Sequence, residues 1–160
     1  MNDVLNAQDF VRHAGFEGTW IWSASVPCSA RLNSGEYLNV YLHVAHGDAP
    51  PAAELEFART LVSDAGRVVL SAVEFVRERL RDAPWECGAS KNEAYALLSL
   101  ALQEFPLYEA SFMVRAVDDW EVHFAHGRLP ICDPNGVIVM FSEVEPINIV
   151  DISEVLEEDT

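Results

Sequence analysis

The stretch "ASFMVRAVDDWEVHFAH" (Ala110 to His126) decides the fold that the sequence predicts. It holds two runs of alternating apolar and polar residues, separated by Asp118 and Asp119. Alternation with a period of two is typical of a strand with one buried face, and Asp favours tight turns because its side chain hydrogen-bonds to the nearby backbone. We therefore predict a β-hairpin with strands over residues 110–117 and 120–126.

The segments on either side of this hairpin carry equally local signals. After it, "DPNG" (Asp133 to Gly136) has the chemistry of a turn and leads into the apolar run "VIVMF". Before it, Ser90 and Glu93 form a capping box, in which the Ser hydroxyl and the Glu carboxylate bond the first free N–H groups of a helix. A helix is therefore predicted to precede the hairpin and another strand to follow it.

The rest of the chain adds three strands and three helices. The run "YLNVYLHVAH" alternates most cleanly, and a short first helix is expected to end at Gly15, since glycine often follows a helix end. The predicted helices cover residues 3–14, 51–64, 67–82 and 90–105. The predicted strands cover residues 19–26, 36–46, 110–117, 120–126, 137–141 and 147–151, and the acidic C-terminal end is left as a frayed turn. Segregated strands and helices predict one α+β domain over residues 1–160, with a mixed or mainly antiparallel sheet of about five or six strands and three to four helices packed on one face.

Charge is the most unusual property of the chain. Asp and Glu number 26 against 10 Lys and Arg, which gives a formal net charge of −16, and no Lys or Arg follows Arg128. Such a surface repels nucleic acid, whose phosphates are bound by clustered Lys and Arg, and it attracts cationic partners. Acidity of this kind serves either a basic protein partner or solubility alone.

The composition favours a protein of the cytoplasm that uses no cofactor. The N-terminal residues do not resemble a secretory signal, and no apolar run approaches the ~20 residues of a membrane span. Cys28, Cys87 and Cys132 are widely spaced and odd in number, which predicts reduced, structural thiols. There is no Walker A sequence, no G-x-G-x-x-G and no G-x-S-x-G, so no cofactor and no catalytic residue is predicted.

The motif H-x-A-H-G-x-x-P occurs twice, as "HVAHGDAP" (His43 to Pro50) and "HFAHGRLP" (His123 to Pro130). The flanking segments do not match each other, whereas a duplicated domain would leave similarity along the whole unit. We interpret the motif as two strand ends, at which Gly47 and Gly127 supply turn geometry.

The histidines of the doubled motif leave a metal site as an alternative. A metal-assisted hydrolase would use His43, His46, His123 and His126. Residues three apart on a strand point to opposite faces, so neither H-x-x-H pair chelates a metal unless the chain turns between its histidines.

Parity places two of these histidines on the polar face of the sheet. His43 and His123 each alternate with apolar neighbours, so both belong to the face opposite the core. If their strands are adjacent, the two imidazoles lie close together, with Tyr41 and Glu121 beside them. The candidate partner-binding residues are Tyr41, His43, Asp118, Asp119, Glu121 and His123.

The stretch "DDWEVHFAHGRLPICDPNGVIVMF" followed by "EPINIVDISE" resembles a pattern in small bacterial proteins of immunity-protein type. The segments "EGTWIWSASVP" and "LNVYLHVAHGDAP" look like the front half of those proteins, so the resemblance covers most of the chain. The residues that carry it are Trp120, Gly127, Pro130, Asp133, Pro134 and Gly136. These are core and turn positions, and the resemblance implies neutralisation of a toxin without supplying a catalytic residue.

Three functions are compatible with the sequence. The first is a non-enzymatic binding protein that neutralises a cationic toxin or nuclease through an acidic face. The second is the metal-assisted hydrolase, and the third is a scaffolding subunit or homodimer. The charge, the lack of a catalytic motif and the resemblance favour the first.

Overall fold

The computed structural model describes residues 5–27, 37–45 and 47–152, which form an α+β fold built on a single mixed sheet. The sheet has seven strands in the order β1-β2-β3-β4-β5-β6-β7. Their bounds are β1 Val11–Ala14, β2 Trp20–Pro27, β3 Tyr37–Val44, β4 Leu107–Ala116, β5 Asp119–Gly127, β6 Val137–Ser142 and β7 Glu145–Asp151. All neighbouring strands are antiparallel except β3 and β4, which are parallel.

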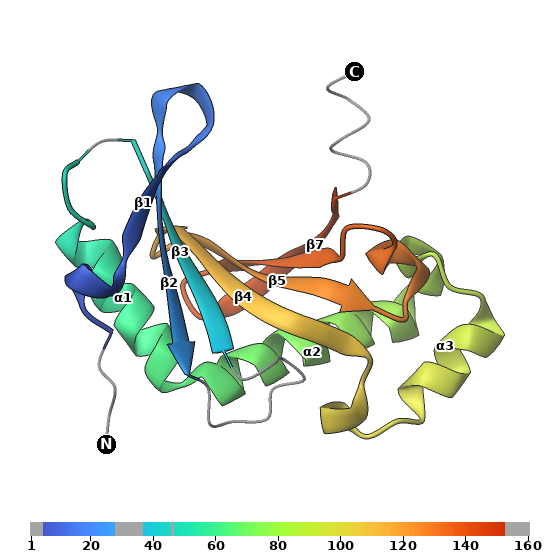
Figure 1. The fold of residues 1–160 in the computed structure, drawn as a ribbon. Coiled ribbons are helices and arrows are strands. Elements are labelled where there is room, and N and C mark those ends of the chain that lie inside the picture. The colour runs from blue at the N-terminus through green and yellow to red at the C-terminus, as the bar shows by residue number, and fades with distance from the viewer. Residues whose placement is uncertain (1–4, 28–36, 46, 153–160) are drawn as a thin grey trace.

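The helices lie in the connection between the two parallel strands. Parallel neighbours need a long crossover, and this one contains α1 (Ala52–Ser63), α2 (Ala65–Asp82) and α3 (Lys91–Leu98). Figure 1 shows α1 and α2 packed along one side of the sheet. The predicted packing of helices on one face is confirmed for these two.

The two faces of the sheet differ because side chains alternate along each strand. The face toward α1 and α2 holds the core, and its buried strand residues include Trp22, Ala24, Val26, Leu38, Val40, Leu42, Ala110, Phe112, Val114, Trp120, Val122, Phe124, Val137, Val139 and Phe141. The opposite face, which we call the open face, carries the alternate residues of the same strands. Their side chains are mostly half-buried.

The predicted fold class is confirmed, and the details differ in strand number and helix length. The sheet has seven strands rather than five or six. The helix predicted over residues 90–105 ends at Leu98, because Ser99 caps it and donates from Oγ to the carbonyl of Ala96 at 2.6 Å. A separate 3-10 helix, Leu102–Glu104, follows it. The acidic end, residues 153–160, lies outside the described residues.

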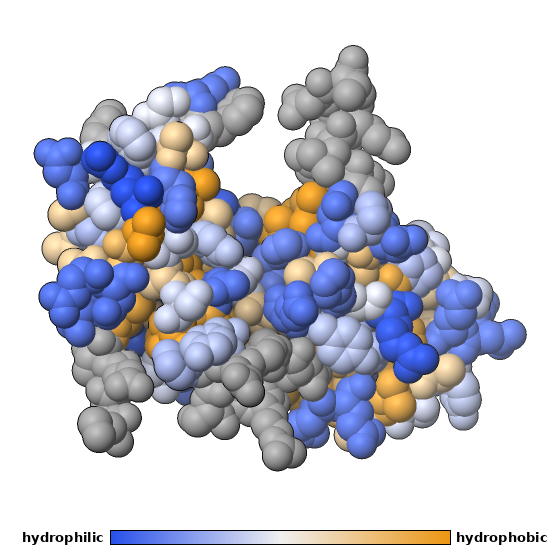
Figure 2. Space-filling model, in the orientation of Figure 1, coloured by the Kyte–Doolittle hydropathy of each residue, from blue (hydrophilic) through white to orange (hydrophobic). Residues whose placement is uncertain are grey.

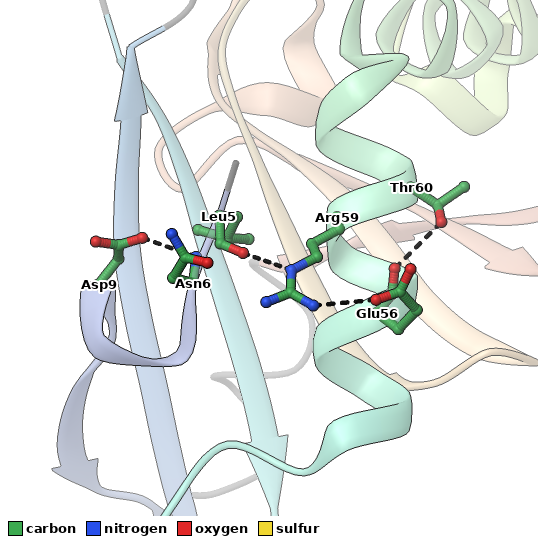
Figure 3. A network of polar contacts seen from close by, with 6 residues as sticks. All are labelled: Leu5, Asn6, Asp9, Glu56, Arg59 and Thr60. Carbon is green, nitrogen blue, oxygen red and sulfur yellow. Dashed lines mark hydrogen bonds and ion pairs between the residues drawn. The ribbon is translucent and has the colours of Figure 1, made fainter. Parts of the chain in front are cut away.

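The helix predicted over residues 3–14 is wrong. The described part of this segment contains only a 3-10 helix, Ala7–Asp9, followed by β1. Leu5 and Phe10, on either side of the 3-10 helix, are both buried. The backbone is extended at Asn6 and Phe10, which flank this short helix. In Figure 3, Arg59 of α1 donates from Nε to the carbonyl of Leu5 at 2.6 Å and so ties the segment to the helix layer.

The two glycines of the doubled motif have different roles. Gly47 has a φ of 128°, so it supplies turn geometry as predicted. Gly127 is the last residue of β5, where a Cβ would lie 2.6 Å from the sulfur of Cys132 and 3.0 Å from the carbonyl oxygen of Pro106. The prediction of a turn role for Gly127 is therefore wrong, since close packing is what requires glycine there.

Candidate functional site

A groove with a volume of about 520 Å³ crosses the open face from β1 to β5. We call it the open-face groove, and its lining residues are His13, Ile21, Ser23, Tyr41, Ser111, Met113, Glu121 and His123. A smaller pocket of about 300 Å³ shares three of these residues and extends toward Asp9 and Asn39. Figure 2 shows a depression between the part of the molecule that carries β1 and β2 and the part that carries β6 and β7.

Strand register brings these residues together from distant parts of the sequence. One row across the sheet runs from Ser23 to Tyr41, Met113, Glu121 and Met140 on successive strands. The next row runs from Asn39 to Ser111 and His123. Because each residue of a row sits opposite the next, the polar groups of four strands meet at the centre of the open face.

Three of the predicted partner-binding residues line the groove, and His43 does not. Tyr41, Glu121 and His123 belong to its two central rows. β4 lies between β3 and β5, so the adjacency that would bring His43 beside His123 does not occur. Instead the Nε2 of His43 lies 2.8 Å from the Oγ1 of Thr19, the residue just before β2.

His13 is a groove residue that sequence reasoning missed. It lies on β1, and its Nε2 is 2.9 Å from the Oγ of Ser23 across the first strand pair. The sequence signal for this position is "GFEG" (Gly15 to Gly18), which closes a hairpin through positive φ angles at Glu17 and Gly18. A hairpin turn there indicates a strand before Gly15, and His13 lies on that strand.

Arg115 ties two of the acids beside the groove into one cluster. Its guanidinium donates to Asp119 at 3.0 and 3.1 Å and to Glu121 at 2.9 Å. Burial alone would lower the pKa of Arg115, but the hydrogen bonds to Asp119 and Glu121 raise it overall, so the arginine stays charged. One cation against two carboxylates leaves the cluster with a net negative charge.

The turn before β5 separates the two predicted aspartates. Asp118 lies exposed in the β4–β5 turn and Asp119 begins β5. Neither lines the groove. The predicted turn position is confirmed for Asp118, whereas Asp119 belongs to β5 and is tied to Glu121 through Arg115.

The strands carry very few cations. Within the described strands, Lys and Arg occur only at Arg12 and Arg115. Arg12 lies on the helix side of β1, with its guanidinium 4.3 Å from the ring centre of Trp20 and 3.5 Å from a carboxylate oxygen of Asp48. The open face of these strands therefore carries one arginine, and two acids bind it.

The hydrogen bonds of the groove histidines are suited to recognition. The Nε2 of His123 lies 3.1 Å from the carbonyl oxygen of Asn135, and because a carbonyl only accepts, this nitrogen must carry a proton. His13 contacts Ser23, but in the described part of the chain no third group is seen to orient its Nδ1, as a catalytic triad requires. The groove thus offers a phenol, imidazoles, hydroxyls and a carboxylate as hydrogen-bonding groups.

The histidines of the metal alternative do not converge. His126, at the end of β5, lies 3.3 Å from a carboxylate oxygen of Glu109 and does not line the groove that holds His123. His46 lies outside the described residues. Across residues 5–27, 37–45 and 47–152, no group of three His, Cys, Asp or Glu side chains is arranged to hold a metal ion.

Two of the cysteines lie in the core and are unpaired. Cys87 and Cys132 are buried free thiols, whereas Cys28 lies outside the described residues. Burial raises the pKa of Cys87 to about 11 and that of Cys132 to about 12. The neutral thiol is therefore the form present near neutral pH.

Both buried cysteines are expected to resist alkylation in the folded protein. With iodoacetamide at pH 8, peptide mapping by mass spectrometry should find Cys87 and Cys132 unmodified until denaturant is added, because the thiolate is the reactive form. Because folding raises the pKa of both thiols, their neutral forms stabilise the folded state. This contribution to the free energy of unfolding is fully present at pH values below the pKa of the thiols in the unfolded chain. It should be lost as the pH rises through the folded-state pKa values of about 11 for Cys87 and about 12 for Cys132. Rapid native alkylation of either residue would contradict this burial.

The described helices include none that is both long and apolar enough to cross a membrane. The open-face groove combines hydrogen-bonding side chains with a net negative cluster of Arg115, Asp119 and Glu121, of which Glu121 lines it. Comparison of the chain with protein families, with curated proteins and with solved structures gives no match.

Proposed function

We propose that this protein is a non-enzymatic cytoplasmic binding protein of immunity type. It neutralises a cationic toxin or nuclease by holding a basic segment of that partner in the open-face groove. The observation that carries the proposal is the charge of the open face, where Arg115 is outnumbered by Asp119 and Glu121. A basic side chain that enters the groove meets the carboxylate of Glu121, which Arg115 links to Asp119 outside the groove. No Lys or Arg of the described strands lines the groove to compete with it.

The lining of the groove suits the amphipathic side chains of Lys and Arg. Their aliphatic stems pack on apolar surface while the charged head keeps polar contacts, and Ile21 and Met113 provide such surface beside Glu121. Tyr41 adds a phenol, and tyrosine is frequent among the residues that dominate the energy of protein interfaces. Apolar and acidic groups side by side favour a basic peptide segment.

The net charge of −16 supports the same kind of partner at long range. A field of one sign raises the rate at which an oppositely charged protein arrives, and salt screens it. Affinity for the partner should therefore fall as ionic strength rises. The same charge disfavours binding to nucleic acid.

Co-expression with the product of the adjacent gene, followed by a pull-down at low and at high ionic strength, tests this function. We expect the neighbouring product to arrest growth when it is expressed alone and to be captured and neutralised when both are present. Capture should weaken at high ionic strength, since the contact is between opposite charges. The proposal fails if no neighbouring product binds and none is toxic alone.

Ser111→Arg is expected to weaken binding of that partner by about tenfold to a hundredfold, because like charges across an interface cost several kcal/mol. Ser111 is a residue of β4 that lines the groove opposite His123 of β5, so the new guanidinium would occupy the groove. Asn92→Arg is the matched control, since it adds the same charge at an exposed position of α3. Isothermal titration calorimetry should show a loss for the first variant only, and an equal loss for both would mean that the groove is not the contact.

A further inference from the structure

We propose that a second cleft, on the helix side of the sheet, binds a small hydrophobic amine. The cleft has a volume of about 380 Å³ and lies between the α1–α2 junction, the start of β5 and the β6–β7 turn. It shares no residue with the open-face groove, so this site is independent of the function proposed above.

The floor of the cleft is aromatic. Trp120 stacks on Phe141 with ring centres 4.2 Å apart, and Phe57 meets Trp120 edge-on at 5.7 Å. Leu61 and Val68 extend the apolar lining along the helices. Trp120 and Phe141 are each only 2% exposed, so a ring or a branched aliphatic group would be buried from water mainly against the half-buried Phe57 and Val68, above this aromatic pair.

The rim of the cleft is charged, and its charges do not cancel. Arg67 donates to Asp64 at 2.6 Å, so this cation is already neutralised within the rim. Glu143, in the turn after β6, lies at the same rim and makes no ion pair with a Lys, Arg or His of the described residues. Its backbone carbonyl accepts the indole N–H of Trp120 at 2.7 Å, which fixes the turn over the aromatic floor. The rim therefore favours a cation and disfavours an anion.

The size and polarity of the cleft together define the ligand. Small-molecule sites commonly span about 300–1,000 Å³ and combine an apolar lining with a few polar groups, as this one does. An apolar body would enter the cleft while its ammonium group stays at the wet rim near Glu143, which avoids the cost of burying a charge. A primary amine on a phenylethyl-sized body meets these conditions.

Three probes with one body and different charges test the site. Phenethylamine, 2-phenylethanol and phenylacetate would be titrated into ¹⁵N-labelled protein, and the indole N–H signal of Trp120 would be followed by NMR. We expect phenethylamine to shift this signal and to bind roughly three to five times more tightly than 2-phenylethanol, which is the usual gain from one exposed ion pair. Phenylacetate should bind most weakly, and Trp20, Trp22 and Trp85, which do not line the cleft, serve as internal controls.

Glu143→Gln separates the charge from the cavity. This variant should retain the neutral alcohol and lose the preference for the amine, whereas Glu145→Gln, an exposed change outside the cleft, should keep that preference. The proposal is overturned if no probe moves the Trp120 signal or if phenylacetate binds as tightly as the amine. It is also overturned if Glu143→Gln leaves the preference for the amine unchanged.

Discussion

Gly136→Ala is expected to destabilise the protein by about 3–5 kcal/mol, the sum of a strained backbone and a steric clash. Gly136 precedes β6 with a φ of 85°, a conformation that L-residues rarely adopt. A Cβ at this position would collide with the carbonyl oxygen of Phe124 and lie 2.8 Å from that of Ala125. Both obstacles are backbone atoms of β5, so the clash is relieved only by moving the strand. Chemical denaturation monitored by circular dichroism measures the loss.

Gly18→Ala is the matched control for this prediction. Gly18 also has a positive φ, of 80°, but a Cβ there meets no atom within 4 Å. Only the strain of a positive φ remains in Gly18→Ala, and the free energy of unfolding is expected to fall by about 1–2 kcal/mol. Equal losses for the two variants would show that the approach of Gly136 to β5 is not what requires glycine.

Trp120→Ala is expected to cost about 3–5 kcal/mol, the usual range for removing a buried aromatic side chain. Trp120 is only 2% exposed and contacts Phe57, Phe112 and Phe141 through its ring. The change also removes the donor to the carbonyl of Glu143. The midpoint of urea unfolding should fall, since both the core and the β6–β7 turn lose support.

Trp85→Ala supplies the comparison, because Trp85 is 71% exposed. Its removal should change the free energy of unfolding by no more than about 0.5 kcal/mol. If Trp120→Ala were as mild as Trp85→Ala, the aromatic cluster at the start of β5 would not be part of the stabilising core.

The elements that the sequence predicted correctly are those with local causes. The capping box forms as predicted, with Ser90 Oγ 3.2 Å from the N–H of Glu93 and the Glu93 carboxylate 3.2 Å from the N–H of Ser90. The strands β3 and β5 alternate as their sequences do, because parity depends only on the chain itself. Parity also placed Tyr41, Glu121 and His123 on one face before their neighbours were known.

The errors concern which strands pair with each other. All four residues of β1 are exposed, so the strand has no alternating apolar signal and forms because β2 pairs with it. For this reason the helix predicted over residues 3–14 was wrong and His13 was missed. The expected approach of His43 to His123 depended on strand order, and the parallel pairing of β3 with β4 follows from the crossover through the helices rather than from any one segment.

The methionines report directly on the central proposal, that a cationic partner binds on the open face. The chain has three, and Met113 and Met140 flank Glu121 in one row across that face. With ¹³C-methyl-labelled methionine, NMR spectra would be recorded as the partner recovered in the pull-down is added. The proposal predicts that the Met113 methyl signal shifts most and that Met140 follows. A partner that binds at full stoichiometry and leaves both signals unchanged would contradict it.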